Sequence, residues 1–142
     1  MEQSIKPKLT DSEIKSIVKE RYGKCAETGM STASSCCAIE TSSSSGFATG
    51  HGLYTQEDIS IIPETALSLS RGCGNPTGIA SLRQGETVVD FGCGAGVDVI
   101  LAAQKITPNG KVIGVDFSSE MIERAKQAID EAGISETVEF RI

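Results

Sequence analysis

The most restrictive feature of the sequence is a glycine-rich turn between an expected strand and an expected helix near residue 90. Gly92, Gly94 and Gly96 occupy alternate positions directly after a β-branched run at residues 87–91. Such glycines let the chain turn sharply and let the backbone approach a ligand with no side chain between them. The following helix offers free N–H groups, which favour a carboxylate or a phosphate. The pattern predicts a nucleotide-binding turn; the alternative is a glycine turn that only closes a strand–helix unit.

The C-terminal part of the sequence alternates between strand and helix patterns. We expect a buried first strand at residues 87–91, and further strands at 111–116 and 137–142. Helices are expected at 96–105 and, after the cap Ser118, at 118–132, because their apolar residues recur with the 3.6-residue period. This order is half of a doubly wound sheet. The sequence therefore predicts an α/β, Rossmann-like fold that is truncated after its third strand.

An acidic residue follows the second expected strand. Asp116 stands twenty residues after Gly96, at the position where a carboxylate usually accepts hydrogen bonds from both hydroxyls of a ribose. A dinucleotide fingerprint would need a glycine three residues after Gly94, but Val97 stands there. The site therefore suits a nucleoside without a pyrophosphate. Asp98 is either part of this site or a solvated helix residue.

The N-terminal part divides by composition into three sections. Residues 1–27 hold a helix, expected at 11–22 after a capping box that begins at Thr10, with Gly23 as its stop. Residues 28–50 are rich in Ser, Thr and Gly, so we expect a flexible segment. Residues 51–84 form a helical lead-in, with short helices expected at 56–61, 64–70 and 77–82. Residues 85–142 then form the nucleoside-binding part.

Charge and composition exclude several classes of partner. The net charge is −6 and the isoelectric point is about 4.8, and Lys and Arg form no cluster. We therefore expect no nucleic-acid partner and no membrane partner. The start of the chain lacks the apolar core of a signal peptide, which favours a cytoplasmic protein. In that compartment the five cysteines are better interpreted as free thiols or soft-metal ligands than as disulfides.

Residues 52–132 contain a distinctive set of motifs: Leu53-Tyr54, Glu57-Asp58, Ile62-Pro63-Glu64, Gly72-Cys73-Gly74-Asn75-Pro76, Val112-Ile113-Gly114-Val115-Asp116 and Glu120-Met121. By these motifs the region resembles arsenite methyltransferases of the class I S-adenosylmethionine-dependent superfamily. The Cys-Gly-Asn-Pro motif is the specific part, because other methyltransferases lack it. The resemblance implies that the chain corresponds to the N-terminal portion of such an enzyme.

The resemblance also assigns the cofactor site. S-adenosyl-L-methionine would be the cofactor, with Asp90 and the loop Gly92, Cys93, Gly94, Ala95 and Gly96 at its methionine part. Asp116 would hold the ribose, and Phe117 would lie against the adenine. Many methyltransferases have Ser at the Cys93 position, so this cysteine is interpreted as a small loop residue and not as an arsenic ligand.

The same resemblance implies catalytic thiolates that bind arsenic. Cys73 matches one position of that family, and either Cys36 or Cys37 matches another; the later pair of cysteines would lie beyond Ile142. Trivalent arsenic is soft and prefers thiolate ligands. The implied substrates are arsenite or its thiol conjugates, with a thiol reductant of the glutathione or thioredoxin type, in arsenic detoxification.

The cysteines could also have no part in arsenic binding, and the protein could have another function. Cys25 is interpreted as a helix-end residue, whereas Cys36 and Cys37 are either ligands or idle thiols. We expect residues 28–50 to become ordered only when arsenic binds, and the fragment itself to be inactive. The alternative functions are methyl transfer to another small molecule and a thiol-based arsenic- or metal-binding module.

Overall fold

Three short parallel strands form one sheet in the computed structural model, which describes residues 9–28, 54–70 and 74–142. The strands are β1 (Thr87–Phe91), β2 (Lys111–Val115) and β3 (Val138–Arg141), and they lie in the order β1-β2-β3. Val88 pairs with Val112, which in turn pairs with Val138. This arrangement confirms the predicted α/β, Rossmann-like fold class.

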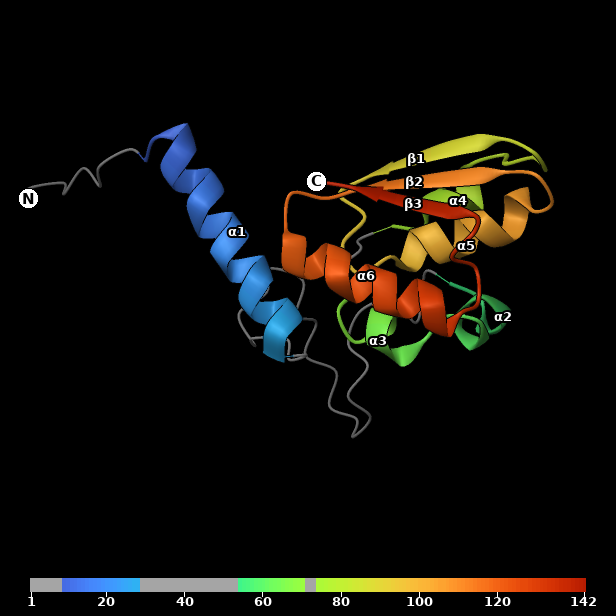
Figure 1. The fold of residues 1–142 in the computed structure, drawn as a ribbon, viewed down its shortest axis with the longest axis horizontal. Helices are drawn as coiled ribbons and strands as arrows, with labels where there is room; N and C mark the ends of the chain where they lie inside the picture. The colour runs from blue at the N-terminus through green and yellow to red at the C-terminus, as the bar shows by residue number, and fades with distance from the viewer. Residues whose placement is uncertain (1–8, 29–53, 71–73) are drawn as a thin grey trace, which may run out of the picture.

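Two helices connect the strands and pack on the same face of the sheet (Figure 1). Helix α5 (Val97–Ile106) follows β1, and most of its residues are buried. Helix α6 (Ser119–Glu131) follows β2 and buries one face only. The Ser118 hydroxyl caps α6 by accepting a hydrogen bond from the Met121 amide at 3.2 Å. Both helices lie where the apolar periodicity predicts them.

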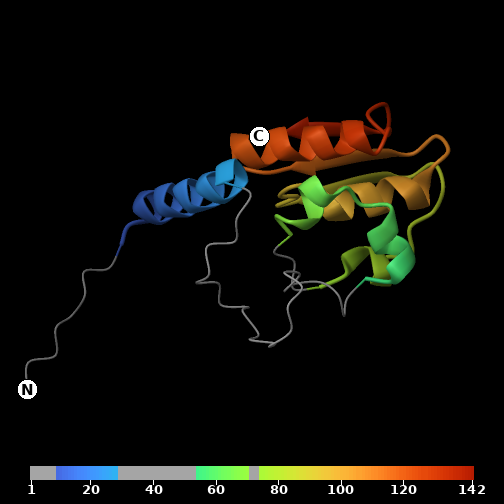
Figure 2. The same cartoon turned by 90° about the horizontal axis from the view of Figure 1, so that it is seen from below.

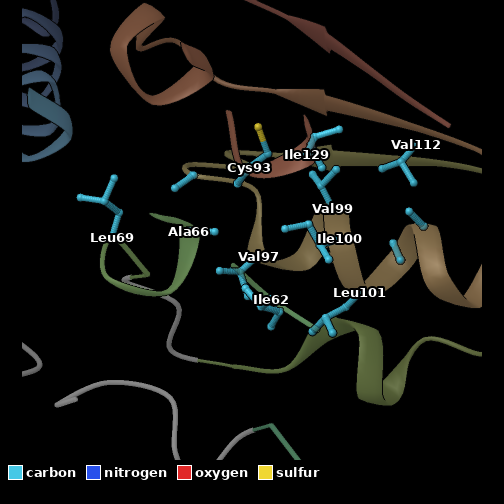
Figure 3. Close-up of a cluster of buried hydrophobic side chains, with 14 of the residues drawn as sticks. Ile62, Ala66, Leu69, Cys93, Val97, Val99, Ile100, Leu101, Val112 and Ile129 are labelled. Carbon is cyan, nitrogen blue, oxygen red and sulfur yellow. The ribbon is translucent and has the colours of Figure 1, made fainter. Parts of the chain in front are cut away.

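The hydrophobic core lies between this face of the sheet and the helices (Figure 3). Val99, Ile100 and Leu101 of α5 are at most 1% exposed. Val112 of β2 and Ile129 of α6 close the cluster from the sheet and from the second helix. The core is mainly aliphatic, which agrees with an aromatic content of only 4%.

The opposite face of the sheet is open in the part of the chain that the structure describes. The expected burial of the first strand is therefore wrong: Val89 is 46% exposed and Phe91 is 82% exposed. Both side chains point away from α5 and α6, because successive strand residues face opposite sides. A β-branched run predicts a buried strand only when both faces of the sheet are covered.

Helix α1 (Asp11–Thr28) is longer than the sequence predicted, and the expected stop at Gly23 is wrong. Gly23 is buried, and a side chain at this position would meet the carboxylate of Glu120 in α6 at 3.4 Å. Arg124 of α6 donates to the carbonyl oxygens of Ala26, at 2.7 Å, and Glu27, at 3.3 Å. Packing and these two hydrogen bonds therefore extend the helix beyond the glycine. Its N-terminal half projects away from the other helices (Figures 1 and 2).

Three short helices form the lead-in: α2 (Gln56–Ser60), α3 (Glu64–Leu67) and α4 (Pro76–Ile79). The first two lie within their expected ranges. The third was expected at 77–82, but it ends at Ile79 because Ala80 adopts an extended conformation. The Asn75 side chain caps it by accepting from the Gly78 amide at 2.7 Å. Nearly all of the expected flexible segment 28–50 lies outside the described residues, as does Cys73.

Within these described ranges, no helix is long and apolar enough to cross a membrane.

Candidate functional site

A pocket of about 400 Å³ opens at the carboxyl ends of β1 and β2. Pockets of this size commonly hold small ligands and cofactors. Its walls include six of the eight residues predicted to bind the cofactor: Gly92, Cys93, Gly94, Ala95, Asp116 and Phe117. Asp90 and Gly96 are not part of the lining. Asp90 is half-buried at the end of β1, and Gly96 precedes α5.

The glycine loop has the geometry that the sequence pattern predicts. Gly92, Gly94 and Gly96 adopt φ angles of 79°, 51° and 91°, a region that favours glycine. The amides of Gly92 and Cys93 both donate to the carbonyl oxygen of Val115, at 2.7 and 3.0 Å, and thereby fix the loop to the end of β2. A Cβ atom at Gly92 or Gly94 would have no neighbour within 4 Å. The loop therefore presents bare backbone to the pocket.

Helix packing, in addition to the backbone conformation, favours glycine at position 96. A Cβ atom there would lie 3.4 Å from the Cβ of Ala125. The missing side chain thus lets the start of α5 pack closely against α6.

Asp116 connects the glycine loop to the start of α6. One carboxylate oxygen accepts from the Gly94 amide and the other from the Ser118 amide, each at 2.9 Å. The side chain is buried, with 8% exposure, yet it contributes to the pocket wall. Each carboxylate oxygen has a second lone pair, so both can still accept from a ligand hydroxyl. Asp116 can therefore organise the loop and bind a ribose at the same time.

Two further carboxylates lie near Asp116 and have raised pKa values. Burial, with smaller contributions from the charges of Asp98 and Asp116, raises the pKa of Asp90 to about 6. Burial also raises the pKa of Asp98, and a hydrogen bond from Tyr54 partly opposes this shift. Desolvated carboxylates near a pocket favour a cationic ligand group, because it would compensate their lost hydration.

Cys93 is buried beside these acids. Burial, followed by the charges of Asp90 and Asp116, raises the pKa of its thiol to about 12. A soft metalloid binds the thiolate, and the raised pKa of Cys93 disfavours this form near neutral pH. The environment therefore supports the interpretation of Cys93 as a small loop residue.

Helix α1 supplies pocket residues that the sequence did not predict. Val18 and Tyr22 of α1 line the pocket together with the glycine loop. The Tyr22 ring lies edge-on to the Phe117 ring, with centroids 6.4 Å apart and an interplanar angle of 83°. Two aromatic rings thus border the part of the pocket where the resemblance places an adenine. No local pattern in the sequence connects α1 with a loop about seventy residues later.

The predicted arsenic ligands Cys36, Cys37 and Cys73 lie outside the described residues. Among the described cysteines, Cys25 and Cys93 are free and buried. In residues 9–28, 54–70 and 74–142, no group of three His, Cys, Asp or Glu side chains is placed to hold a metal ion.

Asp90→Asn should stabilise the protein by about 1–2 kcal/mol at pH 7.5 and by much less at pH 4. The folded protein raises the pKa of Asp90 to about 6, whereas an unfolded aspartate titrates near pH 4. The native state therefore binds the proton more tightly, and stability falls as pH rises from about 4 to about 6. Urea denaturation of both forms at the two pH values measures the difference. An equal effect at both pH values would contradict a charge-based cause.

Comparison with known proteins identifies the class of protein. Residues 82–142 match a family model described as a methyltransferase domain. The structure of an arsenic(III) S-adenosylmethionine methyltransferase from Chlamydomonas reinhardtii superimposes with a TM-score of 0.50 and 30% identity, over 59% of this chain and 29% of that chain. Together with the glycine loop, these matches show that the chain has the fold of the class I S-adenosylmethionine-dependent methyltransferases and that residues 82–142 resemble their methyltransferase domain.

A more extensive match relates the chain to one branch of this superfamily. The arsenite methyltransferase of Halobacterium salinarum is 39% identical over 140 residues, which cover 92% of this chain and 34% of that protein. This match confirms the predicted resemblance to the N-terminal portion of arsenite methyltransferases. A demethylmenaquinone methyltransferase of Symbiobacterium thermophilum is 40% identical over only 33% of this chain and 19% of that protein. The chain spans about a third of the length of its arsenite methyltransferase relative.

The described residues fit S-adenosylmethionine, the cofactor of this superfamily. The bare backbone of the glycine loop leaves room for the methionine part, and the pocket-lining Asp116 has free lone pairs for the ribose hydroxyls. Phe117 is 48% exposed at the pocket and offers an apolar surface to the adenine.

Proposed function

We propose that the protein transfers a methyl group from S-adenosylmethionine to trivalent arsenic bound by cysteine thiolates. The observation that carries this proposal is the extent of the match with arsenite methyltransferase. The methyltransferase domain begins at residue 82, whereas that match covers 92% of the chain and so includes most of the sequence before the domain. The shared part therefore includes more than a cofactor-binding domain.

The chemistry of the substrate supports the same proposal. S-adenosylmethionine supplies an electrophilic methyl group, and the arsenic lone pair forms the new As–C bond as the S–C bond breaks. The chain therefore needs to bind and orient arsenic but needs no strong base. Cys73, together with Cys36 or Cys37, would supply the thiolates. Gly74-Asn75-Pro76, directly after Cys73, leads into α4, where the Lys105 side chain of α5 donates to the Thr77 carbonyl oxygen. The residues that follow the proposed ligand are thus attached to the helix of the cofactor site.

A thiol reductant follows from the electron balance of this proposal. Methyl transfer uses the lone pair and raises the formal oxidation state of arsenic by two. A reductant of the glutathione or thioredoxin type would supply two electrons and restore the trivalent state. Arsenite or its thiol conjugates would then be the substrates, and detoxification of arsenic would be the physiological role.

Incubation of the full-length gene product with S-adenosylmethionine, arsenite and glutathione tests the proposal. We expect methylated arsenic and one S-adenosylhomocysteine for each methyl group transferred to arsenic, with neither product when arsenite is left out. S-adenosylhomocysteine formed from another small acceptor, with no methylated arsenic, would favour a different methyltransferase. Arsenite binding that Asp116→Ala leaves intact, without methyl transfer in either form, would favour a binding module.

A further inference from the structure

The hydroxyl of Tyr54 makes contacts that the predicted cofactor site does not explain. This side chain is only 7% exposed, and its ring packs in the hydrophobic core. The hydroxyl lies 3.1 Å from a carboxylate oxygen of Asp98 and 3.3 Å from the carbonyl oxygen of Gly74. It is therefore placed to donate to two acceptors that lie 44 and 20 residues further along the chain.

The two acceptors belong to different parts of the protein. Asp98 lies in the first turn of α5 and lines the pocket. Gly74 precedes Asn75, which caps α4 in the lead-in. A hydroxyl has one proton, so it can donate fully to only one acceptor at a time. Both contacts hold the same side chain between the pocket wall and the lead-in.

The surroundings of Tyr54 keep its hydroxyl protonated, so that it acts as a hydrogen-bond donor. Burial, followed by the charge of Asp98, holds the pKa of the Tyr54 hydroxyl far above its usual range, so it stays protonated. Its hydrogen bond lowers the pKa of Asp98 against the effect of burial and so favours the ionised carboxylate. A hydrogen bond to a charged group is among the stronger ones in proteins.

We propose that Tyr54 is a positioning residue for the cofactor site, which holds the Asp98 carboxylate in the pocket wall and fixes the segment from Gly74 to Ile79 beside it. The inference concerns cofactor binding and does not depend on arsenic as the methyl acceptor. It assigns part of the geometry of the pocket wall to Tyr54, which does not itself line the pocket.

Tyr54→Phe in the full-length gene product tests this inference, because it removes the hydroxyl and keeps the ring in the core. S-adenosylhomocysteine is the probe, and its affinity is measured by calorimetry. We expect the affinity to fall about fivefold, which is less than the direct loss of one hydrogen bond to a charged group, because Tyr54 acts through Asp98 and does not line the pocket. Thr65→Val is the matched control, because the Thr65 hydroxyl also donates to a carboxylate, that of Glu131, and neither residue lines the pocket. This control should leave the affinity unchanged.

A double-mutant cycle separates positioning from simple packing. If Tyr54 acts through Asp98, Tyr54→Phe should lower the affinity in the wild-type background but not in Asp98→Ala. Equal losses in both backgrounds, or no loss in either, would overturn the proposal and leave Tyr54 as a core residue. If Tyr54→Phe fails to fold, Asp98→Ala alone decides: its affinity for S-adenosylhomocysteine must fall, and unchanged affinity overturns the proposal.

Discussion

Asp116→Ala should weaken S-adenosylhomocysteine binding by roughly 10- to 150-fold, which corresponds to about 1.5–3 kcal/mol. The substitution removes both proposed hydrogen bonds to the ribose. It also leaves the amides of Gly94 and Ser118 without the carboxylate that now accepts from them. The glycine loop then loses its fixed geometry in addition to the direct contact. Calorimetry on the full-length gene product measures the affinity.

Asp130→Ala is the control for this experiment. Asp130 also accepts a side-chain hydrogen bond, from Ser135, but it lies at the far end of α6 and is exposed. The Asp130→Ala protein should bind S-adenosylhomocysteine with the same affinity as the unmodified protein. Because Asp116 also organises the loop, the melting temperature of each variant should be measured in parallel. Unchanged affinity in a folded Asp116→Ala protein would refute the assignment of the pocket.

The fold could be predicted well wherever one local pattern determined each element. The helix α6 shows this clearly, because Ser118 is a strong cap and Met121, Ile122, Ala125 and Ile129 keep the helical period. Glycines at alternate positions could be assigned to a sharp turn for the same reason, since the φ angles of that turn are accessible to few other residues. These predictions depend on neighbours in sequence and not on distant contacts.

The extent of α1 could not be predicted because distant packing determines it. Gly23 is a common helix stop when a helix ends in water. Here Glu120 lies against the glycine, and Arg124 donates to the last turn. Both residues belong to α6, roughly one hundred positions later. The position of Tyr22 in the pocket wall follows from the same packing. It therefore could not be predicted from the local sequence either.

The candidate site shows the same division between local and distant information. Asp116 was predicted from its place after a strand, and the structure places it in the pocket wall. Its hydrogen bonds to Gly94 and Ser118 depend on how the loop after β1 packs against the loop after β2. Local sequence patterns do not predict this packing. Asp98 remained undecided between a solvated residue and a site residue. Its contact with Tyr54, 44 positions earlier, became visible only in three dimensions.

Cys73→Ser should reduce arsenite methylation by roughly tenfold or more while S-adenosylhomocysteine binding stays unchanged. Loss of supporting groups around a metal already costs about 10- to 100-fold in affinity or activity, and a direct ligand should cost at least as much. Serine has nearly the same shape as cysteine, but its hydroxyl is a hard oxygen donor that soft arsenic does not prefer. Rates of methylated arsenic formation by the full-length gene product measure the effect.

Cys25→Ala provides the matched control, because it removes a thiol that is buried in α1 with 8% exposure. It should change stability slightly and leave arsenite methylation unaltered. The pair of variants therefore distinguishes a specific thiolate from a general loss of thiols. If Cys73→Ser keeps full activity, Cys73 is only a loop residue and the proposed arsenic site loses its most specific member. If both cofactor binding and methylation fall together, Cys73 supports the fold near Gly74 and the pocket, and its role as a ligand is not needed to explain the loss.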